Sequence, residues 1–328
     1  MAESRKCQVL VIGAGPGGYV AGIRSAQLGL DTIVVEGDKA GGTCLIRGCI
    51  PSKAIIHAAE RFESLRQHSA DGGHMGLSVK GEAEVDMVGL VSWKDSIVDR
   101  LNKGVEGLLK AAGADLIKGW ASFDGPKSCT IDTGAGSVKI EAENVIIATG
   151  SSHIDLPFMP CDEEFVISST GALDLESLPK SVAIVGGGYI GLELGCALAK
   201  LGSKITVVEG MSSVLAIMDK EIRRPLEMWL KKHKVTVHTD SLARGVEIKG
   251  RGASKKAELT FEKDGTEHKV KVDKVLVTVG RKPNTKGWGL ENTGIRMDGS
   301  GRFIRPTDNA EHQFRGYMQL GMYLVSQC

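Results

Sequence analysis

Two segments of the chain repeat one pattern, and this repetition restricts the possible folds more than any other feature of the sequence. In each segment a short apolar strand leads into a glycine-rich loop, a helical stretch follows, and a second strand ends at a glutamate. From the first glycine of the loop to the glutamate, the first segment runs from Gly13 to Glu36 and the second, of equal length, from Gly186 to Glu209. This order of strand, glycine loop, helix, strand and acid is typical of the βαβ unit that binds dinucleotides.

The glycines of such a loop allow a tight turn and a close approach of the backbone to a pyrophosphate, and the acid accepts hydrogen bonds from ribose hydroxyls. Two units predict either two bound dinucleotides or a duplicated domain of which one copy is idle. The carboxylate of Glu209 favours NAD over NADP, because it repels a 2′-phosphate.

Two cysteines, Cys44 and Cys49, lie between the two units, just before a stretch expected to be helical at 54–65. A close pair at a helix N-terminus favours a thiolate and a redox-active disulfide. Two unrelated core thiols and half of a zinc site are the alternatives, and the pair by itself leaves them open. The other cysteines are scattered singly, without a histidine at ligand spacing, so we expect no metal site; they are Cys7, Cys129, Cys161, Cys196 and Cys328.

Length and charge restrict the class of protein further. A chain of 328 residues predicts two or three domains. With 41 basic and 40 acidic side chains, it offers no strong field to nucleic acid or to an anionic membrane. No apolar run is long enough to span a bilayer, and the first residues show neither a signal peptide nor a presequence. These features predict a soluble protein of a reducing compartment, the cytoplasm or the mitochondrial matrix.

The remaining elements follow from apolar spacing and turn residues. We expect a scaffold helix at 85–112, short strands at 115–140, a buried strand at 144–147, a hairpin at 259–272 around Asp264 and Gly265, and a strand at 273–279.

A cysteine pair between two glycine loops resembles the flavin disulfide reductases, the class I pyridine nucleotide-disulphide oxidoreductases. The residues around Cys44 and Cys49, together with three further stretches at 168–173, 188–193 and 279–285, are similar to the dihydrolipoyl (lipoamide) dehydrogenase branch. The similarity extends from residue 6 to about residue 301.

The resemblance implies an α/β fold with two Rossmann-like domains, in which an NAD-binding domain is inserted into a discontinuous FAD-binding domain. The expected boundaries are 1–150 and 276–310 for FAD, 151–275 for NAD and 311–328 for an atypical tail. The residues implied for FAD are Gly13, Gly15, Gly18, Glu36, Lys53, Gly119, Thr149, Gly150 and Ser151. Those implied for NAD are Gly186, Gly188, Tyr189, Ile190, Gly191, Glu193, Glu209 and, at the domain junction, Gly280.

The resemblance also implies an activity, the oxidation of protein-bound dihydrolipoamide with NAD⁺, and a part in cell redox homeostasis. Cys44 would exchange with the dithiol, Cys49 would lie against the flavin, and Lys53 and Glu193, one from each domain, would pair beside the flavin ring. The implied partners are lipoyl domains of 2-oxoacid dehydrogenase or glycine cleavage complexes. The alternatives are a reductase of glutathione or mercuric type and a catalytically silent nucleotide-binding protein.

The sequence departs from this family at its end. Residues 303–328 lack the Gly-Asp dipeptide that is typical of the family, and they lack its interface domain with a His–Glu pair. Residues 317–322 are at most weakly similar to the segment that carries this dipeptide. We therefore expect an impaired homodimer and little turnover of lipoamide. We expect His312 to be an ordinary surface residue, and we assign no chemistry to the other histidines, including His153.

Overall fold

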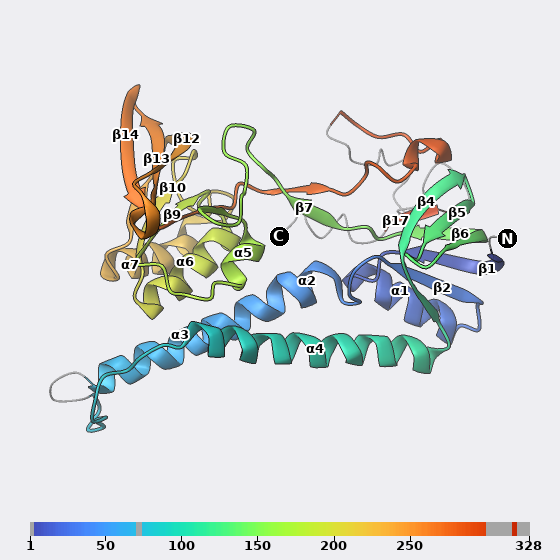
Figure 1. Ribbon diagram of the computed structural model, residues 1–328, viewed down its shortest axis with the longest axis horizontal. Helices are drawn as coiled ribbons and strands as arrows, with labels where there is room; N and C mark the ends of the chain where they lie inside the picture. Colours follow the sequence, from blue (N-terminus) through green and yellow to red (C-terminus); the bar gives the residue numbers. More distant parts are fainter. Residues whose placement is uncertain (1–2, 70–73, 300–316, 320–328) are drawn as a thin grey trace. The chain divides into compact units, whose positions relative to one another are not determined.

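The computed structural model describes residues 3–69, 74–299 and 317–319 of the chain (Figure 1). It forms two compact units, the first made of residues 1–49, 97–152 and 281–328 and the second of 50–96 and 153–280. Both units combine helices with largely parallel sheets, so the predicted α/β class is confirmed. This grouping differs from the predicted domain boundaries, because residues 50–96 fall in the second unit, where Ile55, Ala59 and Met87 join its core.

The first unit is built on a seven-stranded sheet with the order β3-β2-β1-β6-β5-β4, in which β17 also pairs with β6. The strands are β1 (Glu3–Ile12), β2 (Thr32–Glu36), β3 (Asp115–Lys118), β4 (Trp120–Gly125), β5 (Ser128–Asp132), β6 (Ser137–Ile147) and β17 (Tyr317–Gln319). Strands β1, β2, β3 and β17 belong to the parallel part, whereas β4, β5 and the first half of β6 form an antiparallel meander. The expected strands at 115–140 are therefore confirmed, although the first of them pairs with β2.

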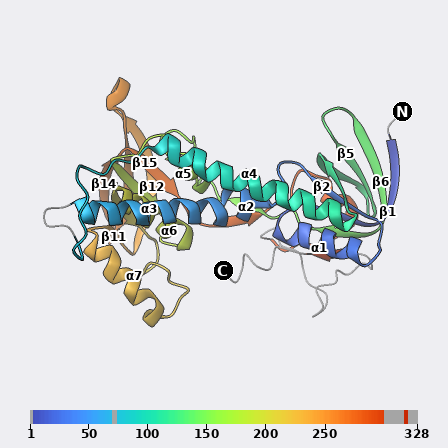
Figure 2. The same ribbon diagram turned by 90° about the horizontal axis from the view of Figure 1, so that it is seen from below.

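Helix α1 (Pro16–Gln27) lies along β1 and β2 of this sheet (Figures 1 and 2). Its approach depends on a small residue, because a Cβ at Gly22 would come 2.5 Å from a methyl group of Val34. The core of the unit includes Leu10, Ile33 and Ile140, which are completely buried. The short helix α2 (Gly42–Arg47) and the turn η2 (Leu290–Thr293) belong to this unit as well.

Two long helices follow α2 along the chain. Helix α3 (Cys49–Ser69) falls almost entirely in the second unit, whereas α4 (Met87–Ala112) is divided between the units at residue 97. The expected scaffold helix at 85–112 is thus confirmed, apart from its first two residues.

The second unit contains a five-stranded parallel sheet with the order β11-β10-β9-β15-β8. Its strands are β8 (Val166–Ile167), β9 (Ser181–Val185), β10 (Lys204–Val208), β11 (Thr236–His238) and β15 (Lys274–Val277), and its further helices are α5 (Ser169–Leu173), α6 (Tyr189–Leu201) and α7 (Lys220–Lys232). Successive residues of β9 enter two different cores, Val182 and Ile184 on one face, Ala183 and Val185 on the other. A strand buried on both faces explains why β9 is continuously apolar.

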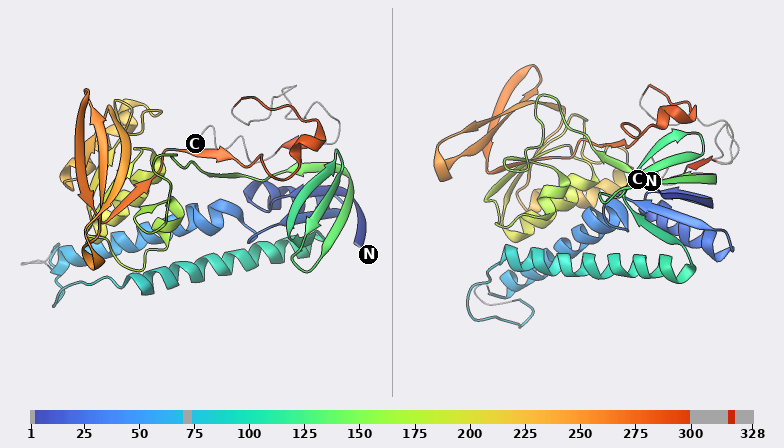
Figure 3. Two further views of the ribbon diagram at one scale, coloured as in Figure 1. Left: turned by 45° about the horizontal axis from the view of Figure 1, so that its top comes forward. Right: turned by 45° about the vertical axis from the view of Figure 1, so that its right-hand side comes forward.

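A three-stranded antiparallel sheet covers the second of these faces and is drawn in yellow and orange in Figure 3. It consists of β12 (Ser241–Lys249), β13 (Lys256–Lys263) and β14 (Thr266–Val272), with the turn η1 (Gly252–Ser254) between the first two. The predicted hairpin is confirmed: Asp264 and Gly265 have φ of 50° and 73°, as a two-residue type I′ turn requires.

Candidate cofactor and redox sites

The first glycine loop lies at the carboxyl end of β1, where its glycines are required by contact. A Cβ at Gly13, whose φ is 98°, would overlap the carbonyl oxygen of Ala148, and one at Gly18 would overlap the carbonyl oxygen of Gly13. Gly15 is the N-cap of α1 and brings no side chain to the N–H groups of the first helical turn. These N–H groups can therefore bind an anion such as a pyrophosphate.

Glu36 ends β2 beside this loop, as predicted. Its carboxylate accepts the N–H of Ala14 at 2.7 Å and the N–H of Asp38 at 2.9 Å. Burial raises the pKa of Glu36, and the hydrogen bond from Ala14 and the charge of Arg47 partly oppose this effect. The carboxylate thus has a role that sequence reasoning missed, since it holds the glycine loop through a backbone N–H in addition to the role predicted for it at the ribose.

Gly119 and Thr149 also lie at the carboxyl ends of strands in this sheet. The N–H of Gly119 donates to the carbonyl of Glu36 at 2.9 Å, and a Cβ at Gly119 would lie 2.6 Å from the carbonyl oxygen of Asp132. The hydroxyl of Thr149 donates to the carbonyl of Asn284 at 2.9 Å, and the amide of Asn284 donates back to the carbonyl of Thr149 at 2.9 Å. The structure therefore gathers Gly13, Glu36, Gly119 and Thr149 at one edge of the sheet, where α/β folds bind their ligands.

Gly150 and Ser151 are held by the returning chain. The N–H of Asn284 donates to the carbonyl of Gly150 at 3.0 Å, and Arg281 donates through Nε to the hydroxyl of Ser151 at 2.9 Å. Ser151 begins β7 (Ser151–His153), which pairs with β16 (Arg281–Pro283) in a two-stranded sheet. Gly280, just before β16, has φ of 132°, and its carbonyl accepts the N–H of Ile154 at 3.1 Å.

The cysteine stretch packs directly against the first glycine loop. The N–H of Gly41 donates to the carbonyl of Ala14 at 2.7 Å, and a Cβ at Gly42 would overlap the Cα of Gly15. On the other side, the buried amide of Asn102 donates to the carbonyl of Ala40 at 2.6 Å. Gly42 is thus required for the close contact between two backbones, whereas Gly41 is required by its φ of 112° and by the side chain of Leu45, which a Cβ would meet at 2.7 Å.

Cys44 lies within the short helix α2, whereas Cys49 is the first residue of α3. The expected helix at 54–65 thus begins five positions earlier than predicted, since Pro51 is tolerated in a first helical turn. Gly48, between the two helices, turns the chain back: a Cβ there would lie 2.8 Å from the carbonyl oxygen of Thr43 and 3.3 Å from the Cα of Cys44. Cys49 is exposed and Cys44 is half-buried, so exposure does not select Cys44 as the thiol that meets the substrate.

The second glycine loop repeats the architecture of the first. A Cβ at Gly186, whose φ is 101°, would lie 2.6 Å from the carbonyl oxygen of Thr278, and one at Gly191 would overlap the hydroxyl of the same threonine. Gly188 is the N-cap of α6, and a Cβ there would meet no atom within 4 Å. Gly186 and Gly191 are thus required by packing. Gly188 instead borders open space at the first turn of α6, which includes Tyr189 and Ile190.

Glu209 follows β10 and repeats the hydrogen bonds of Glu36. It accepts the N–H of Gly187 in a short hydrogen bond and the N–H of Met211 at 2.7 Å. In both units the acid at the end of the second strand therefore binds the residue after the first glycine of the loop. This equivalence supports a common origin of the two dinucleotide units.

Lys53 of α3 and Glu193 of α6 form an ion pair in the second unit. The ammonium nitrogen of Lys53 lies 2.7 Å from each carboxylate oxygen of Glu193, and the two side chains are 59% and 37% exposed. The expected pairing is present, although both residues belong to the unit formed by 50–96 and 153–280 and not to two different units. Their position beside a flavin remains a prediction.

The residues of both loops fit a dinucleotide. In each loop, a side chain on two of the glycines would collide with neighbouring atoms, the following helix has an N-terminus without a side-chain cap, and a glutamate lies at the end of the next strand. The segment that leads to the two cysteines packs against the first loop through Gly41 and Gly42, and this matches a flavin as the occupant, because a flavin exchanges electrons with thiols. The fit supports FAD at the first loop and NAD at the second.

Two dinucleotide-binding motifs, with a cysteine pair next to the first, are the arrangement typical of nucleotide-dependent disulfide oxidoreductases. The sequence pattern of one such family, described as pyridine nucleotide-disulphide oxidoreductase, matches residues 7–310. The chain belongs to this family, whose members use FAD and NAD as cofactors.

Several dihydrolipoyl dehydrogenases are similar to the chain in sequence. The chain is 42% identical to that of Pseudomonas aeruginosa over 322 residues, which cover 98% of this chain and 67% of the relative. It is 44% identical to that of Bacillus subtilis over 293 residues, 89% of this chain and 60% of the relative. The mitochondrial protein of Dictyostelium discoideum is 42% identical over 90% of this chain and 60% of its own length. The chain thus spans about two thirds of these relatives or less.

Solved structures give the same fold. LpdA of Mycobacterium tuberculosis superposes with a TM-score of 0.84 at 25% identity, over 97% of this chain and 70% of its own. The flavoprotein disulfide reductase RclA of Escherichia coli gives 0.78 at 25% identity, over 95% and 65%. Among the described residues, no helix is both long and apolar enough to cross a membrane.

Two predictions need correction. Cys161 is not isolated, and His153 has neighbours with which it could bind a metal ion. His153 and Asp155 place ligand atoms within 4.8 Å of the Cys161 sulfur and of one another. Their short spacing in the sequence was a signal, but it became meaningful only with the chain reversal that follows β7.

The predictions for the end of the chain are mostly beyond the reach of the structure. The expectation for His312, and those for residues 303–316 and 320–328, lie outside the described residues. Within the weakly similar segment at 317–322, residues 317–319 form β17, which pairs with residues 145–147 of β6.

Proposed function

We propose that the chain is the FAD- and NAD-binding portion of a dithiol oxidoreductase that oxidises dihydrolipoamide with NAD⁺. The observation that carries this proposal is the packing of the cysteine stretch on the first glycine loop, through Gly41 with Ala14 and Gly42 with Gly15. This packing supports an arrangement in which the thiols and a dinucleotide bound at α1 share one edge of one sheet.

In the first unit, the loop from Gly13 to Gly18 would hold the pyrophosphate of FAD at the N-terminus of α1, and Glu36 would accept from the ribose. Gly119 and the segment of residues 149–151 would border the rest of the cofactor. When bound, FAD supplies an acceptor for two electrons. The side chains of Thr149 and Asn284 each donate a hydrogen bond to the backbone carbonyl of the other residue. These bonds support a fixed backbone on this side of the site.

The two cysteines would perform thiol–disulfide exchange with the substrate. A thiolate of the dithiol attacks Sγ of Cys44, the bond between Cys44 and Cys49 breaks, and Cys49 leaves as a thiolate. The second substrate thiol then displaces Cys44, so the dithiol becomes a cyclic disulfide and both cysteines are reduced. Cys49, the proposed leaving group, is the first residue of α3, a helix of 21 residues.

In the second unit, Gly186, Gly188 and Gly191 would hold NAD, and Glu209 would accept from its ribose and reject a 2′-phosphate. Glu193, in the first turns of α6, would be kept in place by Lys53 near the nicotinamide. The geometry of this ion pair supports a fixed carboxylate, because both of its oxygens bind one ammonium group.

For the substrate, we propose lipoyl groups carried by lipoyl domains of 2-oxoacid dehydrogenase or glycine cleavage complexes, in the cytoplasm or the mitochondrial matrix. The identity of 41 to 44% to proteins named dihydrolipoyl dehydrogenase favours this substrate over glutathione disulfide or mercuric ion. Comparing dihydrolipoamide with these compounds, and NADH with NADPH, separates the proposal from the other reductases.

The decisive experiment is an anaerobic titration of the purified chain with dihydrolipoamide, followed by flavin absorption and by mass spectrometry of alkylated thiols. We expect nearly one equivalent of bound FAD and one dithiol consumed per reduced cysteine pair. Cys44→Ser should abolish the reaction, whereas Cys196→Ser, a half-buried thiol of α6, should leave it unchanged. A chain without flavin, or a reaction that persists in Cys44→Ser, would contradict the proposal and favour a silent nucleotide-binding protein or another thiol.

A further inference from the structure

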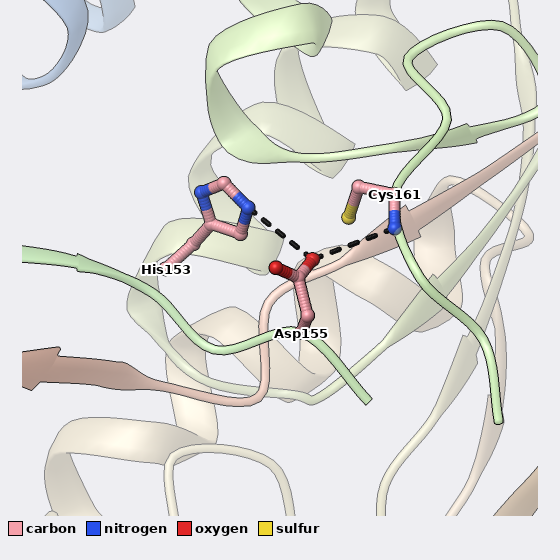
Figure 4. A group of neighbouring side chains, drawn as sticks. All are labelled: His153, Asp155 and Cys161. Atoms are coloured by element: carbon pink, nitrogen blue, oxygen red, sulfur yellow. Dashed lines mark hydrogen bonds and ion pairs between the residues drawn. The ribbon is translucent and has the colours of Figure 1, made fainter. Parts of the chain in front are cut away.

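Three side chains with no part in the proposed reaction converge between β7 and β8. His153 ends β7, Asp155 follows two positions later, and Cys161 returns after a turn. One nitrogen, one oxygen and one sulfur from these residues all lie within 4.8 Å of one another. Figure 4 shows the imidazole and the thiol facing the carboxylate from opposite sides.

The separations are close to those of a metal site. Nε2 of His153 lies 3.3 Å from Oδ1 of Asp155, and the same oxygen accepts the N–H of Cys161 at 3.4 Å. In a tetrahedral zinc site with bonds of about 2.0–2.3 Å, neighbouring ligand atoms lie about 3.3–3.8 Å apart. The nitrogen and the oxygen already have this separation, and the sulfur lies within 4.8 Å of both atoms.

The loop that carries these ligands is fixed by its own contacts. The N–H of Ile154 donates to the carbonyl of Gly280, and that of Met159 to the carbonyl of Leu156 at 2.8 Å. Met159 is also 2% exposed and belongs to a core cluster of the second unit. A loop anchored in this way has already lost much of the conformational freedom that binding an ion would otherwise remove.

The charge around the thiol favours a cation. Asp162, directly after Cys161, accepts three backbone N–H groups, and Glu163 accepts the N–H of Ser168 at 3.1 Å. Two further carboxylates are therefore held beside the ligands.

We propose that His153, Asp155 and Cys161 form a binding site for Zn²⁺, in which water occupies the fourth position. Imidazole, carboxylate and thiolate together suit zinc, whereas Mg²⁺ and Ca²⁺ prefer oxygen ligands. On binding, the S–H bond of Cys161 breaks, the sulfur binds the ion as a thiolate and one proton passes to solvent. The site is independent of the proposed function, because it uses none of the residues assigned to FAD, NAD or the redox pair.

The test uses the untagged full chain with Cys44→Ser and Cys49→Ser, which removes the two thiols that would compete for the metal. Titration with Co²⁺, a spectroscopic substitute for zinc, should saturate at one equivalent with a sulfur-to-metal charge-transfer band. Cys161→Ser should abolish this band, and His153→Ala and Asp155→Asn should each weaken binding by about tenfold or more. The control His233→Asn changes a histidine that binds Glu63 elsewhere in the second unit, and it should bind Co²⁺ normally.

X-ray absorption of the zinc-loaded chain, with Cys161 intact, provides a second measurement that does not depend on how the variants fold. It should show one sulfur at about 2.3 Å and nitrogen or oxygen neighbours at about 2.0–2.1 Å. A shell without sulfur, binding that is equal in Cys161→Ser, or the absence of a one-equivalent site would overturn the proposal.

Discussion

Lys53 and Glu193 lie 140 positions apart in the sequence, yet the ammonium nitrogen of Lys53 is 2.7 Å from both carboxylate oxygens of Glu193. Both side chains are partly exposed, and exposed ion pairs contribute at most about 1 kcal/mol to stability. A pair that adds so little to the free energy of unfolding is better explained by the orientation it gives to Glu193.

We therefore predict different effects of Glu193→Gln on stability and on activity. The free energy of unfolding, measured with urea, should change by less than about 1 kcal/mol. The rate of NADH-dependent dye reduction should fall by about tenfold, which corresponds to about 1.4 kcal/mol in the barrier. Glu262→Gln is the matched control, because it breaks another exposed pair, 2.9 Å from Arg244, and should leave the rate unchanged. Equal rates in both variants would show that the Lys53–Glu193 pair has no catalytic role.

A second prediction concerns Gly48, where the backbone passes close to the backbone of Thr43 and Cys44. Gly48→Ala would place a methyl group 2.8 Å from the carbonyl oxygen of Thr43 and force the backbone around Cys44 to move. Overpacking of this kind costs about 1–3 kcal/mol. We expect the equilibrium constant for forming the disulfide in glutathione buffers to fall by about tenfold, measured by differential alkylation.

Gly104→Ala controls for the loss of a glycine in a helical segment. Gly104 lies within α4, and a Cβ there would meet no other part of the chain within 4 Å. This substitution should leave the thiol equilibrium unchanged and increase stability by about 0.5–1 kcal/mol. A disulfide that forms equally well in both variants would mean that the turn at Gly48 does not position the two cysteines.

A third prediction separates the two nucleotide sites. Glu209→Gln removes the charge that would repel a 2′-phosphate, so the ratio of kcat/KM for NADPH to that for NADH should rise by about tenfold, equivalent to about 1.4 kcal/mol. Glu36→Gln, the equivalent change in the first unit, should lower the FAD content and leave this ratio unchanged. A change of coenzyme preference in Glu36→Gln would reverse the assignment of the two units.

The parts of the fold that could be predicted are those in which neighbouring residues determine the structure. The two βαβ motifs, from β1 to β2 and from β9 to β10, could be predicted from three features of the sequence. These are the apolar strands, the glycines at which the chain turns and the glutamates at equal distance from the first glycine. The turn at Asp264 and Gly265 was predictable for the same reason. Contacts that depend on a turn of the chain were not. His153 and Asp155 are close to Cys161 in the sequence, but the turn that brings the three side chains together does not follow from that spacing. The residues around Glu36 and Glu209 do not show that either acid will bind a glycine loop.

The last prediction uses Cys7 and Cys129, two thiols in the core of the first unit that are 5% and 0% exposed. Burial raises the pKa of Cys7 to about 11 and that of Cys129 to about 12, from an ordinary value of about 9. Between pH 9 and 11 the unfolded chain therefore binds fewer protons than the folded chain, and the free energy of unfolding falls as the pH rises. Below pH 9 both states keep the protons, and this contribution to the pH dependence disappears.

The Cys7→Ala, Cys129→Ala double variant should lose this part of the slope. Between pH 8 and pH 10, urea unfolding should show a decrease that is about 1 kcal/mol smaller for each thiol removed. Ile131→Val, which removes one methyl group from the same core, should lower stability equally at every pH. Because lysine and tyrosine titrate in all three proteins, only the difference in slope reports on the thiols, and an unchanged slope in the double variant would show that they do not titrate on unfolding.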